Sequence, residues 1–115
     1  MEIMVTGRLP KDIVALLRKA HQVEVNPEGR PMPRERLLQR IGEKEGLLCM
    51  VTDRIDAEFL QEAARLKMIA NLGVGYDNID LAAATRARIP VSNTPGVLTA
   101  ATADIAFALI LAMVF

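Results

Sequence analysis

Short apolar runs alternate along this chain with apolar residues at helical spacing. One helical stripe joins Ile13, Leu16, Leu17 and Ala20, and later stripes lie within residues 37–41 and 59–63. The runs predict strands at residues 3–5, 23–25, 47–51 and 68–70, with a fifth short strand within residues 89–96. This alternation predicts an α/β fold, a five-stranded parallel sheet with helices on both faces.

Residues that start or interrupt helices agree with this pattern. Pro10 and Pro33 suit the first turn of a helix. Asp56 is an N-cap residue for the third helix, and Asp80 caps an alanine-rich helix that ends near Arg88. The stretch NPEGRPMP precedes the second helix and is typical of a surface loop.

The C-terminal end of the chain is its most apolar part. From Ile105 to Phe115 no residue is charged, and the run is shorter than the about 20 residues that a membrane span takes. We therefore expect a long apolar helix over residues 98–115 that needs burial on all sides. An exposed helix of this kind tends to find a partner, so we predict a homodimer through it, with or without exchange of elements.

Composition and charge narrow the choice of partners. The 115 residues fit one domain, and 51% hydrophobic with 24% charged residues is a globular profile. The 14 basic and 14 acidic residues cancel, so we expect no nucleic acid and no membrane as a partner. The N-terminal MEIMVTGRLP does not follow the pattern of a signal peptide, and we expect a cytoplasmic protein.

Side chains that carry chemistry are few. The single cysteine, Cys49, lies in an apolar run, where a buried thiol is a better interpretation than a nucleophile. The single histidine, His21, has no second soft ligand to pair with, so we expect no metal site. Because no Ser/His/Asp set and no Walker loop stands out, we predict no catalytic residue in this chain.

The stretch NLGVGYDNID, residues 71–80, opens like the glycine-rich loop of a dinucleotide-binding fold. That loop needs Gly-x-Gly-x-x-Gly, with an acidic residue about 20 positions further on. Gly73 and Gly75 match, but Asn78 takes the third position and no carboxylate lies near residues 93–98. The motif also follows the fourth predicted strand instead of the first. These departures argue against a dinucleotide site.

Two roles stay open for this loop on the residues alone. A parallel sheet places ligands at the carboxyl ends of its strands, and there the backbone N–H groups of Gly73-Val74-Gly75 would bind a small carboxylate or phosphate. The alternative is a turn that only connects strand to helix. The turn at residues 92–96 is likewise either structural or the rim of the same cleft.

The long run NLGVGYDNIDLAAATRARIPVSNTPGVLTAATADIAFALILA resembles the D-isomer-specific 2-hydroxyacid dehydrogenases, in particular their glyoxylate/hydroxypyruvate reductase branch. The earlier GLLCMVTDRIDAEFLQEAARLKMIA agrees with the same family, and the resemblance covers essentially the whole chain. It implies that residues 1–115 form a flavodoxin-like substrate-binding domain without the nucleotide-binding domain. The catalytic Arg, Glu and His of the family lie beyond this segment, and so does a helix that completes the domain.

The resemblance also implies roles for individual residues. Backbone amides at Val74 and Gly75 hold the substrate carboxylate, and Val51 and Thr52 line the same pocket. Thr102, in the stretch ATAD, reaches toward the cofactor, which is NADH or NADPH in the parent enzyme. We expect no cofactor bound to this chain alone.

Two functions follow from these observations. The first is the substrate-binding half of an NAD(P)H-dependent reductase that converts glyoxylate or hydroxypyruvate to glycolate or D-glycerate. The second is a stand-alone module that binds small anions or partners without catalysis. In either case we predict that the isolated chain is inactive as a reductase.

Overall fold

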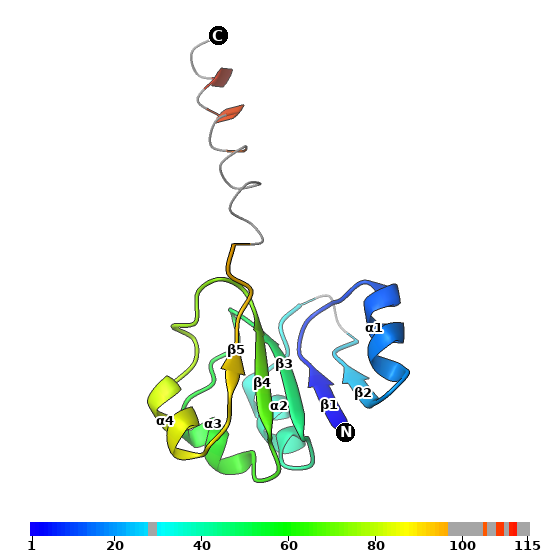
Figure 1. The fold of residues 1–115 in the computed structure, drawn as a ribbon, viewed down its shortest axis with the longest axis vertical. Coiled ribbons are helices and arrows are strands. Elements are labelled where there is room, and N and C mark those ends of the chain that lie inside the picture. Colours follow the sequence, from blue (N-terminus) through cyan, green and yellow to red (C-terminus); the bar gives the residue numbers. More distant parts are fainter. Residues whose placement is uncertain (28–29, 97–104, 106–107, 110, 113–115) are drawn as a thin grey trace.

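The computed structural model describes residues 1–27, 30–96, 105, 108–109 and 111–112 of the chain. Its centre is a sheet of five parallel strands in the order β2-β1-β3-β4-β5, from right to left in Figure 1. This is the flavodoxin-like order of an α/β sheet, so the predicted sheet is confirmed. The strands are β1 (Glu2–Val5), β2 (Gln22–Val25), β3 (Gly46–Met50), β4 (Met68–Leu72) and β5 (Val91–Ser92).

The helices that connect these strands begin where the sequence predicts. They are α1 (Lys11–Arg18), α2 (Arg34–Ile41), α3 (Ala57–Glu62) and α4 (Leu81–Arg86). Asp56 caps α3, because its Oδ1 accepts a 3.0 Å hydrogen bond from the amide of Phe59. Asp80 caps α4 in the same way, with a 2.9 Å bond from the amide of Ala83. Pro10 and Pro33 directly precede α1 and α2.

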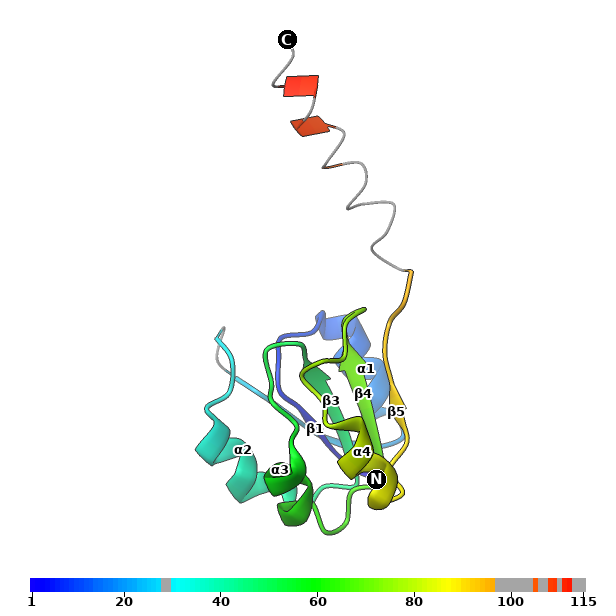
Figure 2. The same ribbon diagram turned by 90° about the vertical axis from the view of Figure 1, so that its left-hand side faces the viewer.

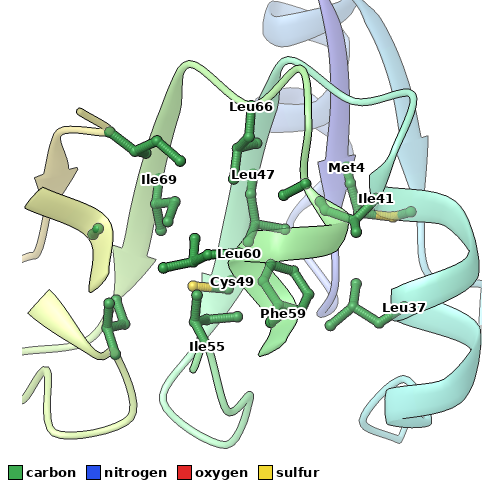
Figure 3. Close-up of a cluster of buried hydrophobic side chains, with 14 of the residues drawn as sticks. Met4, Leu37, Ile41, Leu47, Cys49, Ile55, Phe59, Leu60, Leu66 and Ile69 are labelled. Carbon is green, nitrogen blue, oxygen red and sulfur yellow. The ribbon is translucent and has the colours of Figure 1, made fainter. Parts of the chain in front are cut away.

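One face of the sheet is covered by α2, α3 and α4, and it carries the hydrophobic core. Figure 2 shows α2 and α3 on this side of the sheet. The strand residues that point to these helices, here called the closed face, are Met4, Leu47, Cys49 and Ile69. They are at most 2% exposed and pack with helix residues such as Phe59 and Ile41, as Figure 3 shows. The core therefore lies between the sheet and these three helices.

The other face of the sheet is much less covered. On this face Val5, at the end of β1, is 0% exposed. Four other residues, here called the open face, also alternate with those of the closed face: Ile3, Leu48, Met68 and Ala70. Together with Leu17 of α1 they line an apolar hollow of about 200 Å³. Helix α1 packs against β2 at the edge of the sheet (Figure 1). Met68 is 42% exposed, so strand side chains of this face reach solvent.

The predicted long apolar helix over residues 98–115 is wrong. The helices of the described residues have six or eight residues each, and none is long and apolar enough to cross a membrane. A helix that is apolar all round needs burial on all sides, whereas Ile105 and Leu109 are 63% and 62% exposed. Most of residues 98–115 lie outside the described ranges, and the homodimer expected through them stays a prediction.

Candidate functional site

The candidate site lies at the edge of the sheet where the parallel strands end. Val51 and Thr52 directly follow β3, and the glycine loop, residues 73–78, directly follows β4. Because β3 and β4 are neighbours and run the same way, the two segments emerge side by side. Val51 and Val74 are 50% and 47% exposed, so this edge presents apolar side chains to solvent.

Gly73 lies directly against the side chain of Val51. A Cβ atom built on Gly73 would overlap Cγ1 of the Val51 side chain. Neither Gly73 nor Gly75 has a positive φ; among the described glycines only Gly96, with φ 79°, has one. The first glycine of the loop thus makes room for the segment after β3, and does not supply a left-handed turn.

The carbonyl groups of the glycine loop are held by hydrogen bonds from the protein. The Gly73 carbonyl accepts a 2.9 Å bond from the amide of Thr94, in the segment that follows β5. The Val74 carbonyl accepts a 2.9 Å bond from Nδ2 of Asn93, the neighbour of Thr94. The Gly75 carbonyl accepts a 2.9 Å bond from Nδ2 of Asn71. Three successive peptide groups are therefore fixed in orientation.

The amide groups of Val74 and Gly75 are left for other partners. In a trans peptide the N–H points opposite to the carbonyl of the same peptide group. Since the Gly73 and Val74 carbonyls both face residues 93–94, the amides of Val74 and Gly75 both face away from them. Within the described residues neither amide donates a hydrogen bond to the protein. Two adjacent donors with one orientation are suited to an anion.

A pair of asparagines ties the glycine loop to the segment after β3. Nδ2 of Asn78 donates to the carbonyls of Asp53 and Met50, at 2.9 and 3.2 Å. It also donates to Oδ1 of Asn71 at 3.1 Å, and Asn71 is 1% exposed. The side chain of Asn78 therefore has a structural role that a glycine could not fill. In a dinucleotide-binding loop the third glycine would stand at this position.

A second buried polar cluster lies beside the first, at the ends of β1 and β3. The hydroxyl of Thr6 donates to Oδ2 of Asp53, and the same oxygen accepts a 2.8 Å bond from the amide of Met50. Thr6 and Asp53 are 1% and 6% exposed. They form the base of a hollow of about 110 Å³ that Thr52 and Arg8 also line. The Asp53 side chain thus closes the turn from Met50 to Asp53 that contains Thr52.

The thiol of Cys49 is buried and does not reach the candidate site at the ends of β3 and β4. Cys49 is 0% exposed, and its Sγ donates to Oδ1 of Asn71 at 3.4 Å. Burial raises the pKa of the Cys49 thiol to about 12, and the charge of Asp53 adds to the rise. A thiol of this kind is no nucleophile at neutral pH. Among the described residues no group of three His, Cys, Asp or Glu could hold a metal ion.

The single histidine lies at the amino ends of the strands, whereas the candidate site lies at their carboxyl ends. His21 directly precedes β2, and its Nδ1 is 3.3 Å from the N-terminal amino group of Met1. Strands of four or five residues separate the amino ends from the carboxyl ends by roughly 15 Å. His21 therefore cannot act as an acid or base on a molecule at the glycine loop.

Four of the residues expected to form the site lie together. Val51, Thr52, Val74 and Gly75 occupy the ends of β3 and β4, and their roles in binding stay predictions. Thr102 lies outside the described residues. The sequence predicted no role for Thr6 or Asp53. Asn71, Asn78 and Asn93 lie in segments that it predicted as either part of a site or structural turns. Polar residues directly after buried strands were the available signal.

Comparison with known proteins supports a family assignment. Residues 3–109 match the family model described as D-isomer specific 2-hydroxyacid dehydrogenase, catalytic domain. The chain is 47% identical over 111 residues to the glyoxylate reductase of Pyrococcus furiosus, covering 96% of this chain and 33% of that protein. It thus spans about a third of the length of the curated relatives it matches.

Solved structures agree with the family model. The crystal structure of TT0316 protein from Thermus thermophilus matches with a TM-score of 0.91 and 46% identity, over 97% of this chain and 36% of that one. The cofactor (NAD+) bound 3-phosphoglycerate dehydrogenase of Entamoeba histolytica matches with a TM-score of 0.80 and 28% identity, over 96% and 38% of the two chains. This chain belongs to the D-isomer specific 2-hydroxyacid dehydrogenase family, whose catalytic-domain model covers nearly all of it.

Proposed function

We propose that this chain is the substrate-binding part of an NAD(P)H-dependent 2-keto acid reductase that acts on glyoxylate or hydroxypyruvate. The substrate carboxylate accepts hydrogen bonds from the backbone amides of Val74 and Gly75. The observation that carries this proposal is the orientation of those amides, which are adjacent, face the same way and donate to no described residue. The relative from Pyrococcus furiosus, named a glyoxylate reductase, supplies the substrate class.

The residues of this chain bind and orient the substrate in this proposal. The two amides form charge-assisted hydrogen bonds with the carboxylate, which are shorter and stronger than bonds between neutral groups. Val51 packs on Gly73 and presents its exposed side chain beside the bound carboxylate, where it displaces water. Thr52 would lie at the rim on the side of the Thr6–Asp53 cluster. The anion is thus held without a charged side chain.

The chemical step would take place with residues that this chain does not contain. His21 is at the opposite edge of the sheet, and the Cys49 thiol is buried. The described residues also do not fit the phosphates of a dinucleotide, since Asn78 replaces the third glycine and its side chain is engaged. We therefore assign NADH or NADPH binding to the part of the relatives that this chain does not cover, and expect no reductase activity from the chain alone.

A pair of substitutions at one position tests the role of the amide. Gly75→Pro removes the N–H group, whereas Gly75→Ala keeps it. The new Cβ of the alanine variant lies 3.1 Å from Oδ1 of Asp77, so the Asp77 side chain must move slightly. We expect the unaltered chain to bind glyoxylate, with shifts at the amides of Val74 and Gly75 in an NMR titration. Gly75→Ala should bind similarly and Gly75→Pro at least tenfold more weakly, with circular dichroism confirming that both fold. Equal binding by the proline variant would refute the proposal.

A module that binds small anions without catalysis is the second candidate function. It is favoured by the two amides of Val74 and Gly75, which are suited to any small anion and need no catalytic group beside them. The two functions differ in selectivity, since two backbone amides alone recognise a carboxylate and not a keto group. Acetate binding as tightly as glyoxylate would support the module, and a clear preference for glyoxylate would support the reductase.

A further inference from the structure

Asn93 lies in the segment that follows β5, next to the glycine loop but far from it in sequence. Its side chain is half-buried, and its Nδ2 donates a 2.9 Å hydrogen bond to the Val74 carbonyl, 19 residues away. Asn93 also lines a hollow of about 140 Å³ together with Tyr76 of the loop. The contact therefore joins the end of β5 to the peptide group between Val74 and Gly75.

That peptide group includes one of the two amides of the proposed site. The carbonyl of Val74 and the N–H of Gly75 belong to the same planar unit and point in opposite directions. A donor that fixes the carbonyl consequently fixes the direction of the N–H. The Asn93 side chain thus determines where the Gly75 amide points, although it is on the far side of the peptide from any bound anion.

The other two hydrogen bonds to the loop differ in kind. The Gly73 carbonyl, which sets the Val74 amide, is held by the backbone amide of Thr94 and does not depend on a side chain. The Gly75 carbonyl is held by Asn71, which is 1% exposed and belongs to the buried asparagine pair. Of these three bonds, the one from Asn93 alone comes from a side chain outside the buried pair, so Asn93 can be substituted without disturbing it.

We propose that Asn93 is a positioning residue for the substrate carboxylate, acting through the Val74 carbonyl to direct the Gly75 amide. The inference rests on the proposed function, because it gives the Gly75 amide a ligand. Asn93 itself touches neither the carboxylate nor the reacting atoms. Its loss leaves the Val74 amide directed by Thr94 and releases the Gly75 amide, so binding should weaken through one of the two donors.

The test compares two variants with a matched control in the full 115-residue chain. Asn93→Asp keeps the shape of the side chain but replaces the donor with a carboxylate that repels the carbonyl, and Asn93→Ala removes the side chain. The control is Ser92→Ala, at the exposed neighbouring position. Glyoxylate is titrated into each 15N-labelled protein, and the dissociation constant, the amide shifts and the urea midpoint are recorded.

We expect both Asn93 variants to bind glyoxylate about tenfold more weakly than the unaltered chain and Ser92→Ala. The shift of the Gly75 amide should fall at least threefold while that of Val74 is retained, with urea midpoints close to one another. A merely structural role would instead lower the midpoint or alter both amides alike. If Asn93→Asp binds like the unaltered chain, the inference is wrong and the proposed function stands. If the unaltered chain shows no shift, the proposed function fails, and this inference fails with it.

Discussion

The two faces of the sheet carry similar side chains but differ in what packs on them. Along β3 and β4 the residues alternate, so that Cys49 and Ile69 of the closed face adjoin Leu48 and Met68 of the open face. Residues of the closed face are almost completely buried by three helices, whereas Met68 is 42% exposed. The strand sequence alone, apolar at both kinds of position, does not distinguish the faces.

The closed face mainly stabilises the chain, whereas the open face leaves apolar side chains accessible for contact. Burial of apolar surface on the closed face supplies the main stabilising free energy, at about 25 cal/mol per Å². The same residue types on the open face contribute less, because part of their surface stays in water. Substitutions at neighbouring positions of one strand should therefore have very different effects.

The largest expected difference concerns thiol reactivity on the two faces. Burial raises the pKa of Cys49 from 9.0 to about 12, which lowers its thiolate fraction at pH 8 about a thousandfold. A thiol introduced by Leu48→Cys, in a chain that also carries Cys49→Ala, lies on the less covered face and should react faster by at least tenfold, because its thiolate fraction is larger. The rate of reaction with an aromatic disulfide reagent measures this. Equal rates would mean that the helices do not seal the closed face.

The next effect is on the free energy of unfolding. Ile69→Ala removes a side chain that is 0% exposed and should cost about 2–5 kcal/mol, because a cavity remains in the core. Met68→Ala, one position earlier on the open face, should cost less than about 1 kcal/mol. Urea unfolding followed by circular dichroism gives both values. A costly Met68→Ala would show that another segment covers the open face.

A smaller effect is expected at the start of α3, on the closed face. Asp56→Ala removes the N-cap and should cost about 1 kcal/mol at pH 7. The hydrogen bond from the Phe59 amide, followed by that from Arg34, lowers the pKa of Asp56 below its usual 3.8. The charged carboxylate therefore stabilises the fold fully above pH 3.8, and this contribution is lost as the pH falls through the lowered pKa.

Unfolding of the unaltered chain and of Asp56→Ala at several pH values tests this. The difference between the two proteins should be constant from pH 7 to 5 and shrink below 3.8. Helix α1, which packs against β2, has Pro10 as its N-cap residue and no side-chain capping bond, so it contains no group that corresponds to Asp56. If the difference in unfolding free energy stays the same in acid, the effect of Asp56 comes from helix propensity and not from its charge.

Local signals predicted most of the fold. Asp56 and Asp80 cap the helices that directly follow them, each through the amide three residues further on, and the alternation of strand and helix is enough to require parallel pairing. The apolar C-terminal run was misjudged because composition states that a segment needs burial but not what it packs against. The open face was missed for the same reason, since an apolar strand looks identical whether or not a helix covers it.

The sequence pointed to the ends of the third and fourth strands as the place of a candidate site, but not to the contacts that build it. The glycine loop after the fourth strand was consistent with an anion site or with a connecting turn, and Val51 and Thr52 were assigned to the site through family resemblance alone. The bond from Asn93 to Val74 spans 19 residues, and the contact of Thr6 with Asp53 spans 47. No pattern of spacing predicts such pairs, because they depend on how neighbouring strands are staggered. The close contact that favours glycine at position 73 likewise comes from the side chain of residue 51, at the end of another strand.

The contact of Gly73 with Val51 has an evolutionary consequence. A methyl group on residue 73 would meet Cγ1 of the Val51 side chain, so the two positions share one volume. An alanine at 73 is accommodated most easily when the Val51 side chain turns away or a smaller residue stands at 51. Substitutions at the two positions should therefore be correlated across relatives, even where the surrounding loops diverge.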